Sequence, residues 1–303
     1  MEVHLIDGTY ELFRQFFGQK GHIHEATDGV DIAATTGVLS SVLTMIDEGG
    51  THFAVATDRR IESFRNDLWP GYKTSAGVAP ELLAQFPILE ASLEAMGVTV
   101  LAMDELEADD GLASAAAITD ADSDVTRVLI WTPDKDLAQC VRGRRVVQVD
   151  RRNKMLLDET AVTEKYGVPP ASIPDWLALM GDSADGFPGL AGWGKQSAAT
   201  VLSHYGHLEQ IPADVANWDP LLTRKVRSAP ALAARLQEEF ELALLFRDLA
   251  TLRVDRSLLA GTGALEWTGP AESFAETARY LRSTRLLERA TELGARRRRA
   301  GKA

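Results

Sequence analysis

Nine acidic residues lie in short motifs whose spacing could hold a metal ion. They are Asp7, Asp58, Glu107, Asp109, Asp110, Asp134, Asp136, Asp182 and Asp185. Several are three residues apart and would face the same way on a helix or turn. Carboxylates packed this closely repel one another unless a cation bridges them. Oxygen ligands alone suit a hard ion such as Mg²⁺ or Mn²⁺, and several such ions about 4 Å apart are the usual apparatus of phosphodiester cleavage.

Four short apolar runs predict strands, and three of them lead into acids of this set. Val3–Ile6, His52–Ala56 and Arg127–Trp131 precede Asp7, Asp58 and Asp134, and the fourth run is Val98–Ala102. They alternate with stretches of helical periodicity, which favours a doubly wound α/β sheet. Right-handed crossovers would bring the carboxyl ends of the strands to one edge, where such sheets bind ligands. A single Asp after a strand could be an ordinary turn residue, and acids that open a helix could simply favour its dipole.

Composition limits the class of protein. The 303 residues are 45% hydrophobic and 25% charged, as in soluble globular proteins. We expect a cytoplasmic protein with no membrane partner, since no run spans a bilayer and Asp7 interrupts the N-terminal apolar run. The sole cysteine, Cys140, excludes an intramolecular disulfide. The net charge of −12 argues against a nucleic-acid partner at first sight, but the nine clustered acids account for most of it.

A glycine-rich segment, Gly189–Lys195, fits the start of a phosphate-binding P-loop. However, Gln196 stands where a P-loop has Ser or Thr, and no buried strand precedes the segment. We therefore prefer a hairpin whose backbone N–H groups, at the start of the next helix, bind a phosphate.

Taken together and in this order, the motifs resemble those of the 5′-nuclease family. That family includes the N-terminal domain of bacterial DNA polymerase I, phage 5′-exonucleases and flap endonucleases. The resemblance covers about residues 3 to 250 and all nine acids, and no polymerase portion follows, so a stand-alone form is expected. The matching segments are Leu5–Gly8, Asp58, Phe64–Arg65, Tyr72–Lys73, Leu106–Asp110, Thr132–Gln139, Gly181–Gly186 and Pro188–Lys195.

The resemblance implies a PIN-like parallel sheet core with helices on both faces, followed by a helix–three-turn–helix region. We expect the core over residues 1–165, with a helical arch at about 61–87. The helical DNA-binding region is expected over 166–290. Residues 291–303, which include Arg296–Arg299, are expected to form a flexible basic tail.

The resemblance also assigns roles to residues. The nine acids would bind two or three Mg²⁺ or Mn²⁺ ions, directly or through water, with Asp134 essential to catalysis. Lys73 would contact the scissile phosphate, and Arg14 would lie near it. The remaining expected DNA contacts are Arg65, Tyr72, Gly189, Gly192, Gly194 and Lys195, with K⁺ assisting at the hairpin. Aromatic residues of the arch could stack on bases, although amphipathic helices that bury them, Trp69 included, are the alternative.

Two positions depart from the family pattern. Ala76 stands where relatives have an arginine, which removes a phosphate clamp. Gly186 replaces the usual Asn, which we expect to alter a local turn and not a metal ligand.

The function predicted from the sequence is a structure-specific 5′-nuclease for primer removal and DNA repair. Its expected substrates are 5′ flaps, nicked or gapped duplexes and 5′ ends, cut to a 5′-phosphate and a 3′-hydroxyl. We expect a monomer that associates with the nucleoid when bound to DNA and works beside a DNA polymerase. The alternatives are a PIN-type ribonuclease and a catalytically weak, structure-specific DNA-binding protein.

Overall fold

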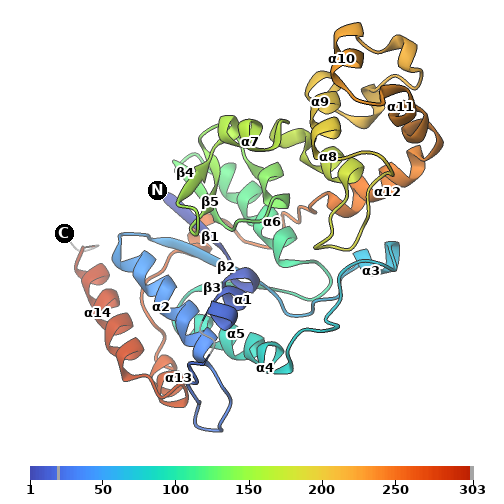
Figure 1. Ribbon diagram of the computed structural model, residues 1–303. Coiled ribbons are helices and arrows are strands. Elements are labelled where there is room, and N and C mark those ends of the chain that lie inside the picture. The colour runs from blue at the N-terminus through green and yellow to red at the C-terminus, as the bar shows by residue number, and fades with distance from the viewer. Residues whose placement is uncertain (19–20, 301–303) are drawn as a thin grey trace. The chain divides into compact units, whose positions relative to one another are not determined.

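The structure is a computed structural model that describes residues 1–18 and 21–300 (Figure 1). Its chain divides into two compact units, each with its own hydrophobic core. The first unit comprises the described parts of Met1–Ile61, Ser75–Thr132 and Val254–Ala303. The second comprises Glu62–Thr74 and Pro133–Arg253. Over the described residues, no helix is long and apolar enough to cross a membrane.

Four parallel strands form the centre of the first unit, in the order β3-β2-β1-β4. They are β1 (Glu2–Asp7), β2 (His52–Asp58), β3 (Thr99–Met103) and β4 (Arg127–Trp131). In register, Ile6 of β1 lies beside Val55 of β2 and Trp131 of β4. All four predicted strands are therefore confirmed, and β1 and β2 end at acidic residues.

Helices cover both faces of these strands, as predicted. On one face, Ile6, Phe53 and Val55 contribute to a core shared with α1 (Gly8–Gly18), α2 (Ala33–Asp47), α4 (Pro80–Leu83) and α5 (Gln85–Ala95). Side chains alternate along a strand, so Ala56 points to the opposite face. There it meets α6 (Ala108–Asp120), where Gly111 leaves room for close packing on Ala56 and Met103.

The C-terminal segment packs onto the first unit. After η5 (Thr262–Leu265), the helices α13 (Phe274–Tyr280) and α14 (Thr284–Ala300) lie beside each other, and α14 lies along α2 (Figure 1). The prediction of a flexible tail over 291–303 is wrong for residues 291–300, which are part of α14. The helix continues through the arginines because Leu293 is buried and Arg296 pairs with Asp47 at 3.1 Å. The remainder of that tail, 301–303, lies outside the described residues.

The second unit is mostly helical, as predicted, but it also holds an antiparallel hairpin of β5 (Val146–Asp150) and β6 (Met155–Leu157) that the sequence reading missed. Trp176, Phe187 and Phe246 lie in its core. Its helices are α3 (Arg65–Leu68), η1 (Asp136–Cys140), α7 (Glu159–Tyr166), η2 (Pro170–Ser172), α8 (Ile173–Met180), α9 (Lys195–Tyr205), η3 (Leu208–Gln210), η4 (Val215–Asn217), α10 (Pro220–Lys225), α11 (Ala229–Glu238) and α12 (Phe240–Ala250).

The two units do not follow the expected boundary at residue 165. Residues 133–165 pack with the helical region, because Gln139 donates to the Ala250 carbonyl at 3.0 Å and accepts from the Leu252 N–H at 3.0 Å. The expected arch, 61–87, is also divided. Residues 62–74 belong to the second unit, and 75–87 belong to the first.

Candidate active site

Two buried aspartates end adjacent strands of the first unit. The Asp7 carboxylate accepts hydrogen bonds from the Tyr10 N–H and the Thr132 hydroxyl, both at 2.8 Å. The Asp58 carboxylate accepts from the Ala108 N–H at 2.7 Å. Because Ala108 is the first residue of α6, that bond ties the end of β2 to the start of this helix. The predicted gathering of acids at the carboxyl ends of the strands is found for these two residues.

The start of α6 carries three more of the predicted acids. Glu107 is the N-cap and forms a reciprocal capping box with Asp110, whose carboxylate accepts from the Glu107 N–H at 3.0 Å. Both residues are buried, whereas Asp109 is half-buried. The helix-capping interpretation therefore holds for Glu107 and Asp110. Their role as metal ligands stays a prediction.

The second unit brings three carboxylates to the spacing of a metal site. Asp136, Asp182 and Asp185 each offer an oxygen, and these oxygens lie within 4.8 Å of one another. The Asp136 Oδ1 atom is buried and has no hydrogen-bond partner within the described chain. Burial, followed by the charges of Asp134 and Asp185, raises the pKa of Asp136 well above its usual range, against an opposing effect of Lys135. A buried carboxylate that lies beside other carboxylates is stabilised by a nearby cation.

Short, constrained backbone segments fix these acids. Asp136 begins η1, and its N–H donates to the Asp134 carboxylate at 3.0 Å. The Gln148 side chain holds the Asp134 carbonyl. After α8, Asp182 and Phe187 exchange backbone hydrogen bonds of 2.8 and 3.0 Å, which closes the loop that presents Asp182 and Asp185.

Two lysines lie among these carboxylates. The Lys73 Nζ is 3.2 Å from the Asp185 Oδ1, and its expected contact with the scissile phosphate stays a prediction. The Lys135 Nζ is 2.5 Å from the Asp182 Oδ2 and 3.9 Å from the Asp136 Oδ1. The sequence reading missed Lys135. The sequence signal was only partial, because Lys135 stands between Asp134 and Asp136 but its 2.5 Å partner, Asp182, is distant in sequence.

The chain near Lys73 is docked on the loop that carries Asp185. The Lys73 N–H donates to the Asp185 carbonyl at 3.0 Å, and the Trp69 indole donates to the Gly186 carbonyl at 3.1 Å. Gly186 has a φ of 81°, and a Cβ there would overlap the Gly71 carbonyl. The departure at Gly186 thus has a structural reason, because only glycine allows both this conformation and this close approach.

Two expected DNA contacts are instead part of the interior. Arg65 is 1% exposed, and its guanidinium donates to the Leu249 and Thr251 carbonyls at 2.8 and 3.2 Å. Tyr72 is 3% exposed and belongs to the core of the second unit. Trp69 packs edge-on against Phe246, with ring centroids 5.1 Å apart. The alternative of buried arch aromatics is therefore correct for Tyr72, whereas Trp69 is only half-buried, and the prediction of DNA contacts by Arg65 and Tyr72 is wrong.

Arg14 forms an ion pair within its own helix. Its guanidinium pairs with the buried Glu11 at 2.5 Å within α1. The hydrogen bond with Glu11 raises the pKa of Arg14, so the guanidinium stays charged. Its expected place near the scissile phosphate stays a prediction.

The glycine-rich hairpin joins two helices. Gly189 and Gly192 have φ values of 69° and 89°. Gly194 is the N-cap of α9, and Lys195, the first residue of that helix, is exposed. Helix α8 and not a strand precedes the hairpin, so the P-loop interpretation is excluded and the prediction of a hairpin between helices is confirmed.

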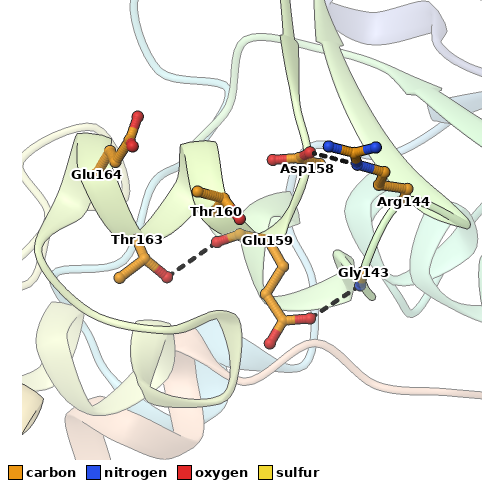
Figure 2. A pocket seen from close by; sticks show the side chains of 7 residues that line it. All are labelled: Gly143, Arg144, Asp158, Glu159, Thr160, Thr163 and Glu164. Atoms are coloured by element: carbon orange, nitrogen blue, oxygen red, sulfur yellow. Dashed lines mark hydrogen bonds and ion pairs between the residues drawn. The ribbon is translucent and has the colours of Figure 1, made fainter.

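A hollow of about 420 Å³ lies at the start of α7 in the second unit (Figure 2). Its polar groups bond to one another: Glu159 accepts from the Gly143 N–H at 2.9 Å, and Arg144 pairs with Asp158 at 3.5 Å. The predicted acids are absent from its lining, so we do not place the chemistry there. The lining residues are Gly143, Arg144, Asp158, Glu159, Thr160, Thr163 and Glu164.

The chain is similar to known protein families along most of its length. Residues 2–167 match the family described as 5′-3′ exonuclease, N-terminal resolvase-like domain. Residues 168–273 match the family described as 5′-3′ exonuclease, C-terminal SAM fold. The chain is 30% identical over 249 residues to the 5′-3′ exonuclease of Aquifex aeolicus (strain VF5), a match that covers 82% of each protein.

A longer protein and a solved structure are also similar. DNA polymerase I of Mycobacterium bovis is 33% identical over 250 residues, which are 81% of this chain but 27% of the polymerase. The chain thus spans about a quarter of the length of this relative. The structure of the bacteriophage T5 flap endonuclease, in a pseudo-enzyme–product complex with DNA and metal ions, matches with a TM-score of 0.65. The match covers 97% of this chain and 98% of the phage protein at 14% identity, which shows a shared fold.

Proposed function

The chain belongs to the 5′-3′ exonuclease family, and from this premise we propose that it hydrolyses DNA phosphodiesters at 5′ ends and at 5′-flap junctions. The observation that carries the proposal is the cluster of Asp136, Asp182 and Asp185, whose oxygens lie within 4.8 Å of one another. The products would be a 5′-phosphate and a 3′-hydroxyl, and the cellular role would be primer removal and DNA repair.

The residues of the cluster fit a divalent ion. All donors are carboxylate oxygens, which Mg²⁺ and Mn²⁺ prefer, and the buried Asp136 Oδ1 accepts no hydrogen bond from any described residue, so an ion could bind it. Bound ions would activate water and stabilise the charge that develops on the phosphate. We propose two or three such ions for the protein, and we propose Asp7, Asp58, Glu107, Asp109, Asp110 and Asp134 as metal ligands too. The T5 flap endonuclease complex, which was crystallised with DNA and metal ions, supports this use.

The chain's own cations would act on the substrate. Lys73 is held beside Asp185 by its backbone bond, which supports a role in which its ammonium would neutralise the phosphate that is cut. At the hairpin, the start of α9 and Lys195 would bind a backbone phosphate, with K⁺ as an added counter-ion, and Gly189, Gly192 and Gly194 would permit the close approach. Such contacts read the shape of the substrate and not its sequence.

We further propose that residues up to about 165 supply seven of the nine catalytic acids, that Asp182 and Asp185 supply the other two, and that the helical region after residue 165 binds DNA. A DNA polymerase would be the partner, since the relatives include DNA polymerase I, which holds a matching segment within a longer chain. The protein would act as a monomer.

Cleavage of a 5′-labelled flap duplex tests the proposal. Mg²⁺, Mn²⁺ or EDTA is added, and a blunt duplex of the same sequence is the control. We expect metal-dependent cutting near the flap junction and none with EDTA. Tight binding without cutting in either metal would instead indicate a catalytically weak DNA-binding protein. Faster cutting of an RNA flap than of a DNA flap of equal sequence would indicate a PIN-type ribonuclease.

A further inference from the structure

Lys135 lies among the three carboxylates proposed as metal ligands. We infer that it is a built-in counter-ion, which occupies the cation position of Asp136 and Asp182 in the metal-free protein and must swing away when a divalent ion binds. The inference rests on the proposed function, since it concerns the same cluster. It assigns Lys135 as a positioning residue that sets the affinity for the ion.

The distances show why the lysine and an ion exclude each other. The Lys135 Nζ lies 2.5 Å from the Asp182 Oδ2, close to the roughly 2.0–2.6 Å at which Mg²⁺ or Ca²⁺ binds a carboxylate oxygen. The three ligand oxygens lie within 4.8 Å of one another, so an ion that reaches all three would stand next to this ammonium. Two cations at such a distance repel strongly in a partly buried position.

Each of the two lysines pairs with a different carboxylate of the cluster. Lys73 pairs with Asp185, whereas Lys135 pairs with Asp182 and also faces the orphaned Asp136 oxygen at 3.9 Å. Asp136 and Asp182 are buried, and without a nearby cation their carboxylates would repel each other. Lys135 therefore stabilises the metal-free fold at the position where the ion belongs.

The lysine can leave without moving the ligands. Its backbone is held by the start of η1, where the Lys135 carbonyl accepts from the Ala138 N–H at 3.1 Å. Its side chain is 26% exposed and ends a flexible four-carbon stem, so a rotation brings the ammonium into solvent. The displacement lowers the affinity for the ion below what the carboxylates alone would give.

Calorimetric titration of the metal-free full chain with Mg²⁺ tests this inference. We expect Lys135→Met to bind Mg²⁺ about tenfold more tightly than wild type, which corresponds to the loss of one partly screened ion pair. The melting temperature of metal-free Lys135→Met should fall. Lys135→Arg should keep the wild-type affinity, and Lys225→Met, which removes an exposed lysine of α10, should change neither quantity.

The outcomes separate the possible causes. A purely structural lysine would lower the melting temperature without a gain in affinity, and equal or weaker binding by Lys135→Met would overturn the inference. If wild type binds Mg²⁺ and cuts flaps while the affinity of the variant is unchanged, the proposed function stands and only the role of Lys135 fails. If wild type and variant neither bind Mg²⁺ nor cut flaps, both fail. Lys135→Gln, with the same expected gain, keeps the test decisive if the methionine variant does not fold.

Discussion

Replacing Gly186 with alanine should undock the segment that carries Lys73. The added Cβ would overlap the Gly71 carbonyl, so residues 69–73 cannot stay where they are. The segment would then lose the hydrogen bonds from the Trp69 indole and from the Lys73 N–H. Each such bond contributes about 1 kcal/mol. An alanine in the left-handed region destabilises the fold by about 1 kcal/mol more. The free energy of unfolding should therefore fall by about 3 kcal/mol in total.

Gly29→Ala is the matched control. Gly29 has a φ of 87°, against 81° for Gly186, and apart from its chain neighbours no atom of the described residues lies within 4 Å of a Cβ placed there. This variant keeps the conformational cost without the backbone clash. Its free energy of unfolding should fall by about 1 kcal/mol. The difference between the two variants isolates the close approach of Gly186 to Gly71.

Urea unfolding followed by tryptophan fluorescence measures both losses, provided that the slope against urea is unchanged. Single-turnover cleavage of a flap duplex then shows whether Lys73 has moved. We expect Gly186→Ala to be the less stable and the slower of the two variants. Equal stability losses, within about 0.5 kcal/mol, would refute the reasoning, because the clash would then carry no energetic weight.

Two further predictions concern single side chains. Lys73→Ala should slow the single-turnover rate of cleavage more than it weakens DNA binding, since Lys73 is expected to act on the phosphate that is cut; an effect confined to the dissociation constant would reduce it to a binding contact. Burial lowers the pKa of His4 to about 4 from 6.5, so the free energy of unfolding should be greatest above pH 6.5 and fall by about 3 kcal/mol as the pH drops to 4. His4→Gln can still accept the 3.1 Å bond from the Trp131 indole but does not titrate, so a pH dependence as steep as that of wild type would contradict this account.

The parts of the fold that depend on local pattern could be predicted from the sequence. Buried parallel strands are continuous apolar runs, which made β1 to β4 recognisable, and Asp7 and Asp58 end their strands as expected. The hairpin β5–β6 was missed. Met155 and Leu156 of β6 are exposed, so this strand lacks the buried apolar run that identified the others.

Side-chain direction and distant partners could not be predicted. An arginine and a tyrosine in a basic, aromatic segment suggest DNA contacts, but the carbonyl partners of Arg65 lie 184 and 186 residues away in sequence. Nothing local shows that these partners bury the guanidinium. Likewise, the sequence places Lys135 between two aspartates, yet its partner Asp182 lies on the loop after α8. The arginines after residue 295 resemble a solvated tail until α14 is seen to pack along α2.

The central claim is that the carboxylate cluster of the second unit holds the ions that cut DNA. Single-turnover cleavage of one 5′-flap duplex by wild type and by Asp136→Asn, in Mg²⁺, tests it most directly. The account predicts that the rate falls by about a thousandfold or more, while the metal-free variant is at least as stable as wild type because one buried, repelled carboxylate is gone. Cleavage by Asp136→Asn at a rate near that of wild type would contradict the account.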